Sequence, residues 1–166
     1  LAAGLRTEVP WLARLGIAVL AALGLHAVYH PYALALADGA VAWKAKVDKK
    51  NGTNCSPLAV GDLVVVPAGR RLVAIARADG AVRWKAPVKV WNNSPVAWHH
   101  DGKDYVIVGN ETISCLDAAD GSVAWTMVGT DRAKDPSSPA IAGDLMATLF
   151  EGGGLRVHRL SPTGAE

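Results

Sequence analysis

Short strand-like stretches separated by turns make up most of the hydrophobic pattern of this chain. From residue 56 to residue 86 these stretches are Pro57–Val60, Leu63–Val66, Leu72–Ala76 and Val82–Lys85. The β-branched second stretch is typical of a strand buried on both faces, and glycine-containing turns follow the first and third stretches. The pattern predicts four short antiparallel strands. The next unit repeats it at Pro95–Trp98, Tyr105–Gly109, Thr112–Leu116 and Ser122–Thr126.

A phrase that ends in tryptophan sets the repeat length. The copies are Ala37–Lys44, Ala78–Lys85 and Ala119–Thr126, and their tryptophans, Trp43, Trp84 and Trp125, lie 41 residues apart. A weaker fourth copy begins at Pro162. Four strands per 41 residues suit a propeller blade, because one small sheet buries its faces only by stacking on others. We therefore predict an all-β fold, a β-propeller fragment of about three and a half four-stranded antiparallel blades with a 41-residue repeat.

The repeat also divides the chain. It predicts a partial first blade at 15–46, blades at 55–86 and 94–127, and an incomplete blade at 137–166, with 1–14 unassigned. Ser-Pro steps at Ser56, Ser94 and Ser138 mark the entry to three of these units. An alternative for 12–30 is a signal or anchor segment, because its apolar run follows Arg6 and Arg14.

Composition narrows the classes of protein. The 166 residues are 51% hydrophobic and 19% charged, which excludes a disordered tail and a coiled coil. The net charge is +2 and no basic run occurs, so nucleic acid is not an expected partner. Two cysteines are too few for a disulfide framework or a Cys-rich zinc module.

The tryptophan phrase carries a family resemblance. Ala-x-x-x-x-Asp-Gly-x-x-x-Trp, at 33–43 and 74–84, resembles the tryptophan-docking motif of PQQ-like (quinoprotein-like) propellers. The third copy has Cys115 in place of the alanine and keeps the motif's Asp at Asp117. Aspartate replaces the motif's threonine in all three copies. The resemblance covers about 33–164 and implies blade-docking positions at Trp43, Trp84, Trp125, Gly39, Gly80 and Gly121.

The resemblance is specific for the family and leaves two functions open. It implies an exported protein, periplasmic or extracellular, with membrane anchoring under the signal or anchor alternative. The first function is a non-enzymatic scaffold that binds a protein or peptide, with a small molecule as the second ligand class. The alternative is part of a PQQ-dependent alcohol or sugar dehydrogenase, which would bind PQQ with Ca²⁺. No adjacent cysteine pair occurs, and no Asp or Glu can be matched to that enzyme's base, so no catalytic residue is assigned.

Binding residues are expected on loops. In a propeller one face carries the loops that lead into the innermost strand and those that join the second and third strands. Polar side chains on these loops could hold an anion or a cation, or could be merely solvated. The candidates are Asn54, Arg70, Asn92, Asn93, Asn110, Glu111 and Asp135.

Three further features have mainly structural interpretations. His99-His100-Asp101 is expected in a turn where neighbouring side chains diverge, which argues against a metal site. Cys115 is expected to be a small buried core residue. Trp91 and Trp98 are interpreted as packing residues, with a stacking floor for a cofactor as the alternative.

Overall fold

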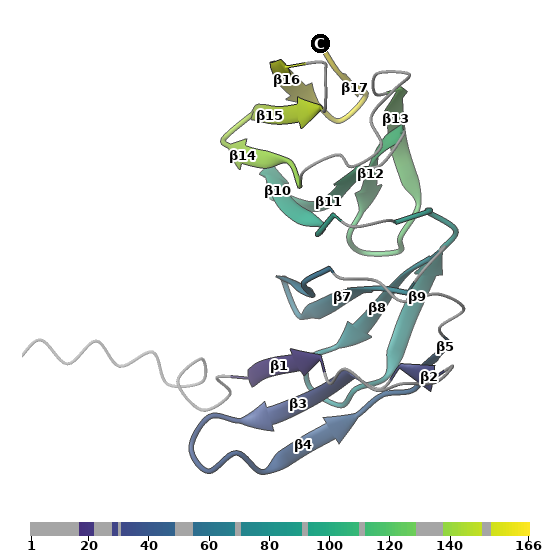
Figure 1. Ribbon diagram of the computed structural model, residues 1–166, viewed down its shortest axis with the longest axis vertical. Helices are drawn as coiled ribbons and strands as arrows, with labels where there is room; N and C mark the ends of the chain where they lie inside the picture. The colour runs from purple at the N-terminus through teal and green to yellow at the C-terminus, as the bar shows by residue number, and fades with distance from the viewer. Residues whose placement is uncertain are drawn as a thin grey trace, which may run out of the picture.

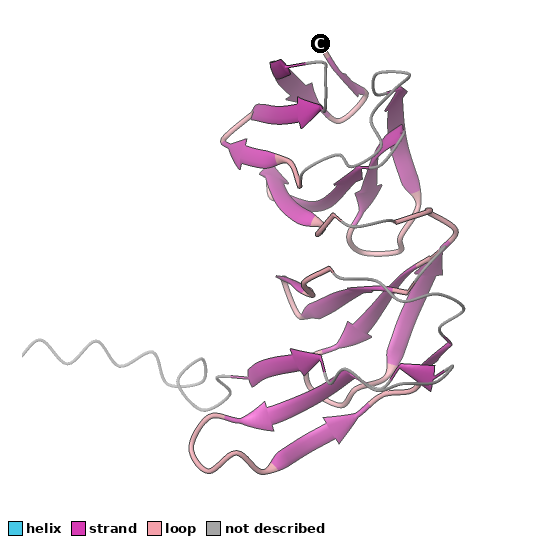
Figure 2. Ribbon diagram, viewed as in Figure 1, coloured by secondary structure: helices cyan, strands magenta, loops and turns pink. Residues whose placement is uncertain are grey.

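The computed structural model contains strands joined by turns and loops, with no helix in the part of the chain that it describes (Figure 1, Figure 2). The described residues are 17–21, 28–29, 31–48, 55–68, 71–90, 93–109, 112–128, 138–150 and 154–166. Antiparallel sheets follow one another along the chain, each next to the one before it (Figure 1). This arrangement confirms the expected all-β propeller fragment.

The second blade shows how the sequence pattern produces a sheet. Its strand order is β6 (Leu58–Val60), β7 (Leu63–Pro67), β8 (Leu72–Ala76) and β9 (Val82–Ala86). Every residue of β7 and β8 is buried, as expected for central strands between two neighbouring sheets. In β9 burial alternates, and Trp84 and Ala86 are the buried positions. These four strands agree with the predicted ranges to within one residue.

The third and fourth blades repeat this order. The third contains β10 (Val96–His100), β11 (Lys103–Gly109), β12 (Thr112–Asp117) and β13 (Val123–Val128). The fourth contains β14 (Ala140–Ala142), β15 (Leu145–Phe150), β16 (Gly154–Ser161) and β17 (Gly164–Ala165). The innermost strand β10 lies beside β6 and β14, so the blades meet along their first strands.

The first blade is a three-stranded sheet in the described residues. Its order is β1 (Ile17–Ala21), β3 (Pro31–Ala35) and β4 (Val41–Lys44). A separate two-stranded pair joins β2 (Val28–Tyr29) to β5 (Val47–Asp48). Strand β1 falls within the 12–30 segment, for which a signal or anchor stays the alternative prediction.

Three hydrophobic clusters lie between successive blades. The first–second cluster packs Ala33, Trp43 and Val47 against residues of the second blade such as Val64 and Ile75. The other two clusters join the second blade to the third and the third to the fourth. In each case the tryptophan-bearing face of one blade packs on the opposite face of the next. Stacking therefore buries the faces that a single sheet leaves open.

The Ser-Pro steps are linked from blade to blade. The backbone N–H of Ser56 donates to Ser94 Oγ at 2.8 Å, and the backbone N–H of Ser94 donates to Ser138 Oγ at 2.7 Å. Each serine thus helps to fix the start of the innermost strand in the blade before it. The recurrence of this step in the sequence has a direct structural reason.

One local prediction was wrong. His99 and His100 do not lie in a turn, because β10 continues through both of them and the turn is Asp101-Gly102. Both turn residues have positive φ, 48° and 73°, so two residues suffice to reverse the chain. The side chains of His99 and His100 point to opposite faces of the strand, as alternation requires.

Candidate functional site

Each tryptophan of the repeated phrase reaches from its own blade to the following one. Trp43 Nε1 donates to the carbonyl oxygen of Arg77 at 2.7 Å, and Trp84 Nε1 donates to that of Ala118 at 2.8 Å. Trp125 Nε1 donates to the carbonyl oxygen of Ser161 at 2.9 Å. The side chains are at most 8% exposed, so each indole combines burial with a satisfied polar atom.

Glycine provides the surface on which two of these indoles lie. A β-carbon on Gly80 would approach the ring of Trp43 to 2.9 Å, and one on Gly121 would approach the ring of Trp84 to 2.6 Å. Both glycines have φ near +75°. Gly39 has the same backbone conformation, but nothing lies within 4 Å of its β-position.

The loop-face candidates are mostly outside the described residues. Asn54, Arg70, Asn92, Asn110, Glu111 and Asp135 all fall there, as does Trp91. Asn93 is described and is almost completely buried, at 1% exposure, in the segment that leads into β10. Whether these residues gather at one mouth of the propeller stays a prediction.

A polar cluster joins the third blade to the fourth. Asp144 Oδ1 accepts a hydrogen bond from Trp98 Nε1 at 3.1 Å and lies 3.0 Å from His100 Nδ1. Trp98 is buried and packs against the rings of His100 and Tyr105, with centroid separations of 5.1 and 4.8 Å. On the other face of the same strand His99 pairs with Asp104. Sequence reasoning missed this cluster, since Trp98 and Asp144 are 46 residues apart.

Asp144 owes its electrostatics to these contacts. The hydrogen bond from His100 and then that from Trp98 lower the pKa of its carboxyl group below the usual 3.8, with a smaller contribution from Arg159. The carboxylate is therefore ionised at neutral pH and holds two side chains of the neighbouring blade. The arrangement serves adhesion between blades.

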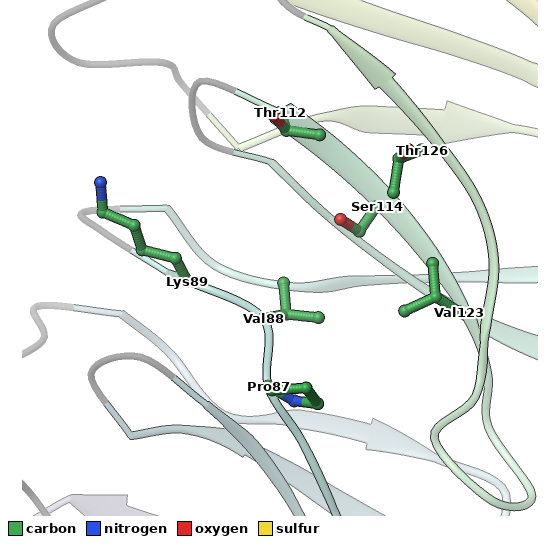
Figure 3. Close-up of a pocket in the computed structure, with 7 residues that line it drawn as sticks. All are labelled: Pro87, Val88, Lys89, Thr112, Ser114, Val123 and Thr126. Atoms are coloured by element: carbon green, nitrogen blue, oxygen red, sulfur yellow. The ribbon is translucent and has the colours of Figure 1, made fainter.

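A groove of about 230 Å³ lies between the second and third blades (Figure 3). One wall is the segment after β9, and the other is formed by β12 and β13, where Ser114 and Thr126 are directly paired. We call it the hydroxyl groove, and its lining residues are Pro87, Val88, Lys89, Thr112, Ser114, Val123 and Thr126. Three hydroxyl groups on one wall face apolar side chains on the other.

The repeat explains why the groove exists. In the second blade, Val73 and Lys85 are paired just as Ser114 and Thr126 are in the third. Val73 packs with Val47 in the first–second cluster. Val88 stands 41 residues after Val47, but it faces the small Ser114 instead of a valine. The signal in the sequence was the replacement of Val and Lys by Ser and Thr at matching positions.

Cys115 is completely buried within the third–fourth cluster. Burial, and secondarily the nearby Asp117 carboxylate, raise the pKa of its thiol to about 12. Cys55 packs against the second–third cluster, so the two cysteines belong to different cores.

Two searches of the described residues found nothing. They contain no group of three or more His, Cys, Asp and Glu side chains that could hold a metal ion. Likewise, they include no helix of sufficient length and apolar character to cross a membrane.

Solved structures share the fold. BamB from Moraxella catarrhalis is 19% identical with a TM-score of 0.62, and the match covers 83% of this chain and 47% of that one. Quinohemoprotein alcohol dehydrogenase from Comamonas testosteroni is 18% identical with a TM-score of 0.54, covering 70% and 20%. The computationally designed Ika4 protein is 9% identical with a TM-score of 0.59, covering 88% and 93%. The chain thus spans less than half the length of the two natural proteins.

Sequence comparison is more specific than the fold. No curated protein matches the chain. A family model described as "Outer membrane protein assembly factor BamB" matches residues 32–165, which is most of the sequence and all three tryptophan phrases. The chain therefore belongs to this family of PQQ-like β-propeller repeats.

Proposed function

We propose that this chain is part of a non-enzymatic, exported propeller that binds an extended segment of a partner protein during outer membrane protein assembly. Family membership supports the general role, since the family is described as an outer membrane protein assembly factor. The hydroxyl groove is the observation that supports peptide binding. Its size, its open hydroxyl groups and its apolar wall suit a strand-like ligand rather than a reacting small molecule.

The first blade shows what the groove wall can do. There the segment that follows the outer strand forms β5 and pairs with β2 through backbone hydrogen bonds. The equivalent segment, residues 87–90, is extended but forms no such strand pair in the described structure. An added peptide would place its backbone along this segment, as in β-augmentation. Ser114 and Thr126 would then hydrogen-bond to its polar positions.

The tryptophans have a supporting role in this proposal. Trp84 is anchored to Ala118 and lies on Gly121, both in the third blade. It therefore fixes the distance between the two walls of the groove. A preformed groove binds an extended segment with less ordering cost than a flexible one.

Fluorescence anisotropy with labelled peptides of about eight residues tests the proposal, with apolar and hydroxyl-bearing residues alternating in the peptide. The double variant Ser114→Val, Thr126→Lys installs the residues of the second blade, so the sheet should fold normally. We expect it to weaken binding by at least about tenfold. Lys103→Ala, in the strand after the Asp101-Gly102 turn, should bind as the wild type does. Absence of wild-type binding, or equal binding by the double variant, would contradict the proposal.

The dehydrogenase alternative requires different residues. Ca²⁺ takes six to eight oxygen ligands, and the described residues bring no three acidic side chains together. This part of the chain therefore does not fit a PQQ–Ca²⁺ site, and we derive no catalytic step. Titration with PQQ and Ca²⁺, followed by dye-linked oxidation of alcohols and sugars, separates the functions. PQQ-dependent dye reduction would overturn the scaffold proposal.

A further inference from the structure

Sulfur-containing side chains are concentrated between the third and fourth blades. The chain has two methionines, and both Met127 and Met146 pack in the cluster that contains Cys115. Cys115 and Met146 are completely buried. Directly across from Met146 in the sheet lies His158, which is its partner in the β15–β16 register. Two thioethers, one thiol and one imidazole thus meet at a single blade interface.

The other blades use hydrocarbon side chains at these positions. Cys115 is paired with Trp125 just as Ala33 is with Trp43 and Ala74 is with Trp84. The pair Met146–His158 corresponds to Val64–Ile75 in the second blade and to Val106–Leu116 in the third. Alanine, valine and leucine or isoleucine are therefore sufficient for packing. All three positions change to metal-ligating residue types at the same interface.

Two buried polar atoms of this interface have no hydrogen-bond partner. They are His158 Nε2 and Thr148 Oγ1. Thr148 is 3% exposed and replaces Val66 and Val108 of the other blades. Buried polar atoms in folded proteins almost always have a partner, so an unpaired pair indicates that something else is bound between these side chains. A ring nitrogen beside thiol and thioether groups indicates a metal.

We propose that the third–fourth blade interface binds one Cu(I) ion through Cys115 Sγ, His158 Nε2 and Met146 Sδ, with Met127 as the neighbouring thioether. Thiolate and thioether ligands are soft and select Cu(I), and imidazole also suits copper. Zn²⁺ takes Cys, His and carboxylate ligands, so the methionines favour copper. On binding, the Cys115 thiol releases its proton to solvent and no electron is transferred.

Anaerobic titration of the reduced, full chain with Cu(I), in competition with bicinchoninate, tests the site. Wild type should bind one equivalent. The variants Cys115→Ala, His158→Leu and Met146→Val each install the residue of another blade, so the fold should persist. Each should bind Cu(I) at least about tenfold more weakly. Cys55→Ala, in a different core, should bind as wild type does.

Thermal unfolding provides a readout that packing alone cannot give. Cu(I) should raise the Tm of the wild type, because a ligand of the native state stabilises it. The Tm of His158→Leu should not respond to Cu(I), whatever its value without metal. Failure of the wild type to bind, weakening by Cys55→Ala equal to that by Cys115→Ala, or tighter binding of Zn²⁺ than of Cu(I) would each overturn the proposal.

Discussion

The indole of Trp84 lies directly over Gly121 of the following blade. A β-carbon at Gly121 would be only 2.6 Å from the ring atoms Cδ2 and Cε3. Gly121 also has a φ of +76°, where side chains are disfavoured. Two independent requirements therefore select glycine at this position of the repeated phrase.

Gly121→Ala should lower the free energy of unfolding by about 2–4 kcal/mol, through backbone strain and a steric clash with Trp84. Gly102→Ala is the matched control, because Gly102 has a φ of +73° but nothing within 4 Å of its β-position. It should cost only about 1–2 kcal/mol from backbone strain. Urea unfolding of both variants measures the difference. Equal losses would show that the indole is not in the way.

Trp84→Phe should destabilise the protein by about 1–3 kcal/mol, since it leaves the carbonyl oxygen of Ala118 without its donor. The bond from Trp84 is buried, whereas the corresponding bond from Trp43 to Arg77 is partly exposed. Water can replace the second donor more easily than the first. Trp43→Phe should therefore cost less, and chemical denaturation should rank the two variants in that order.

Asp144→Ala should lower the unfolding midpoint, because Trp98 and His100 both lose their acceptor. Asp144→Asn should have a smaller effect, since its amide oxygen can still accept from Trp98. Asp101→Ala is the control on a side chain that is 91% exposed, and it should be nearly neutral. Differential scanning calorimetry of the three variants checks this order.

The pKa of Asp120 provides a test in solution. Hydrogen bonds from the side chain and then the backbone of Ser122 lower the pKa of this carboxyl group below 3.8. Because the folded pKa is depressed, the resulting stability is present above pH 3.8. It is lost as pH falls through the folded pKa.

NMR titration should place the midpoint of Asp120 below that of the same residue in the Ser122→Ala variant. That variant reproduces the turn of the second blade, where Asp79 Oδ1 accepts only from the backbone of Ala81. An unchanged midpoint would contradict the assigned cause.

The strands could be predicted closely, because alternating burial and the 41-residue tryptophan phrase repeat the same local physics in each unit. The ends of strands were harder. The two-residue turn at Asp101-Gly102 lets β10 extend through His100, and no hydrophobic pattern indicates this extension.

Site features were less accessible from the sequence. The hydroxyl groove depends on which residue of one blade faces which residue of the next, as Ser114 faces Val88. That relationship follows from strand register and stacking rather than from spacing. The loop-face residues from Asn54 to Asp135, apart from Asn93, stay a prediction outside the described structure.

The three separate hydrophobic clusters have a consequence for how this protein unfolds. Each cluster contains residues of two successive blades only, so cooperativity is transmitted between neighbours along one dimension. The second and third blades are held on both sides in the described chain, whereas the first and fourth are each held on one. Amide hydrogen exchange should therefore be slowest in β7, β8, β11 and β12 and faster toward both ends of the row.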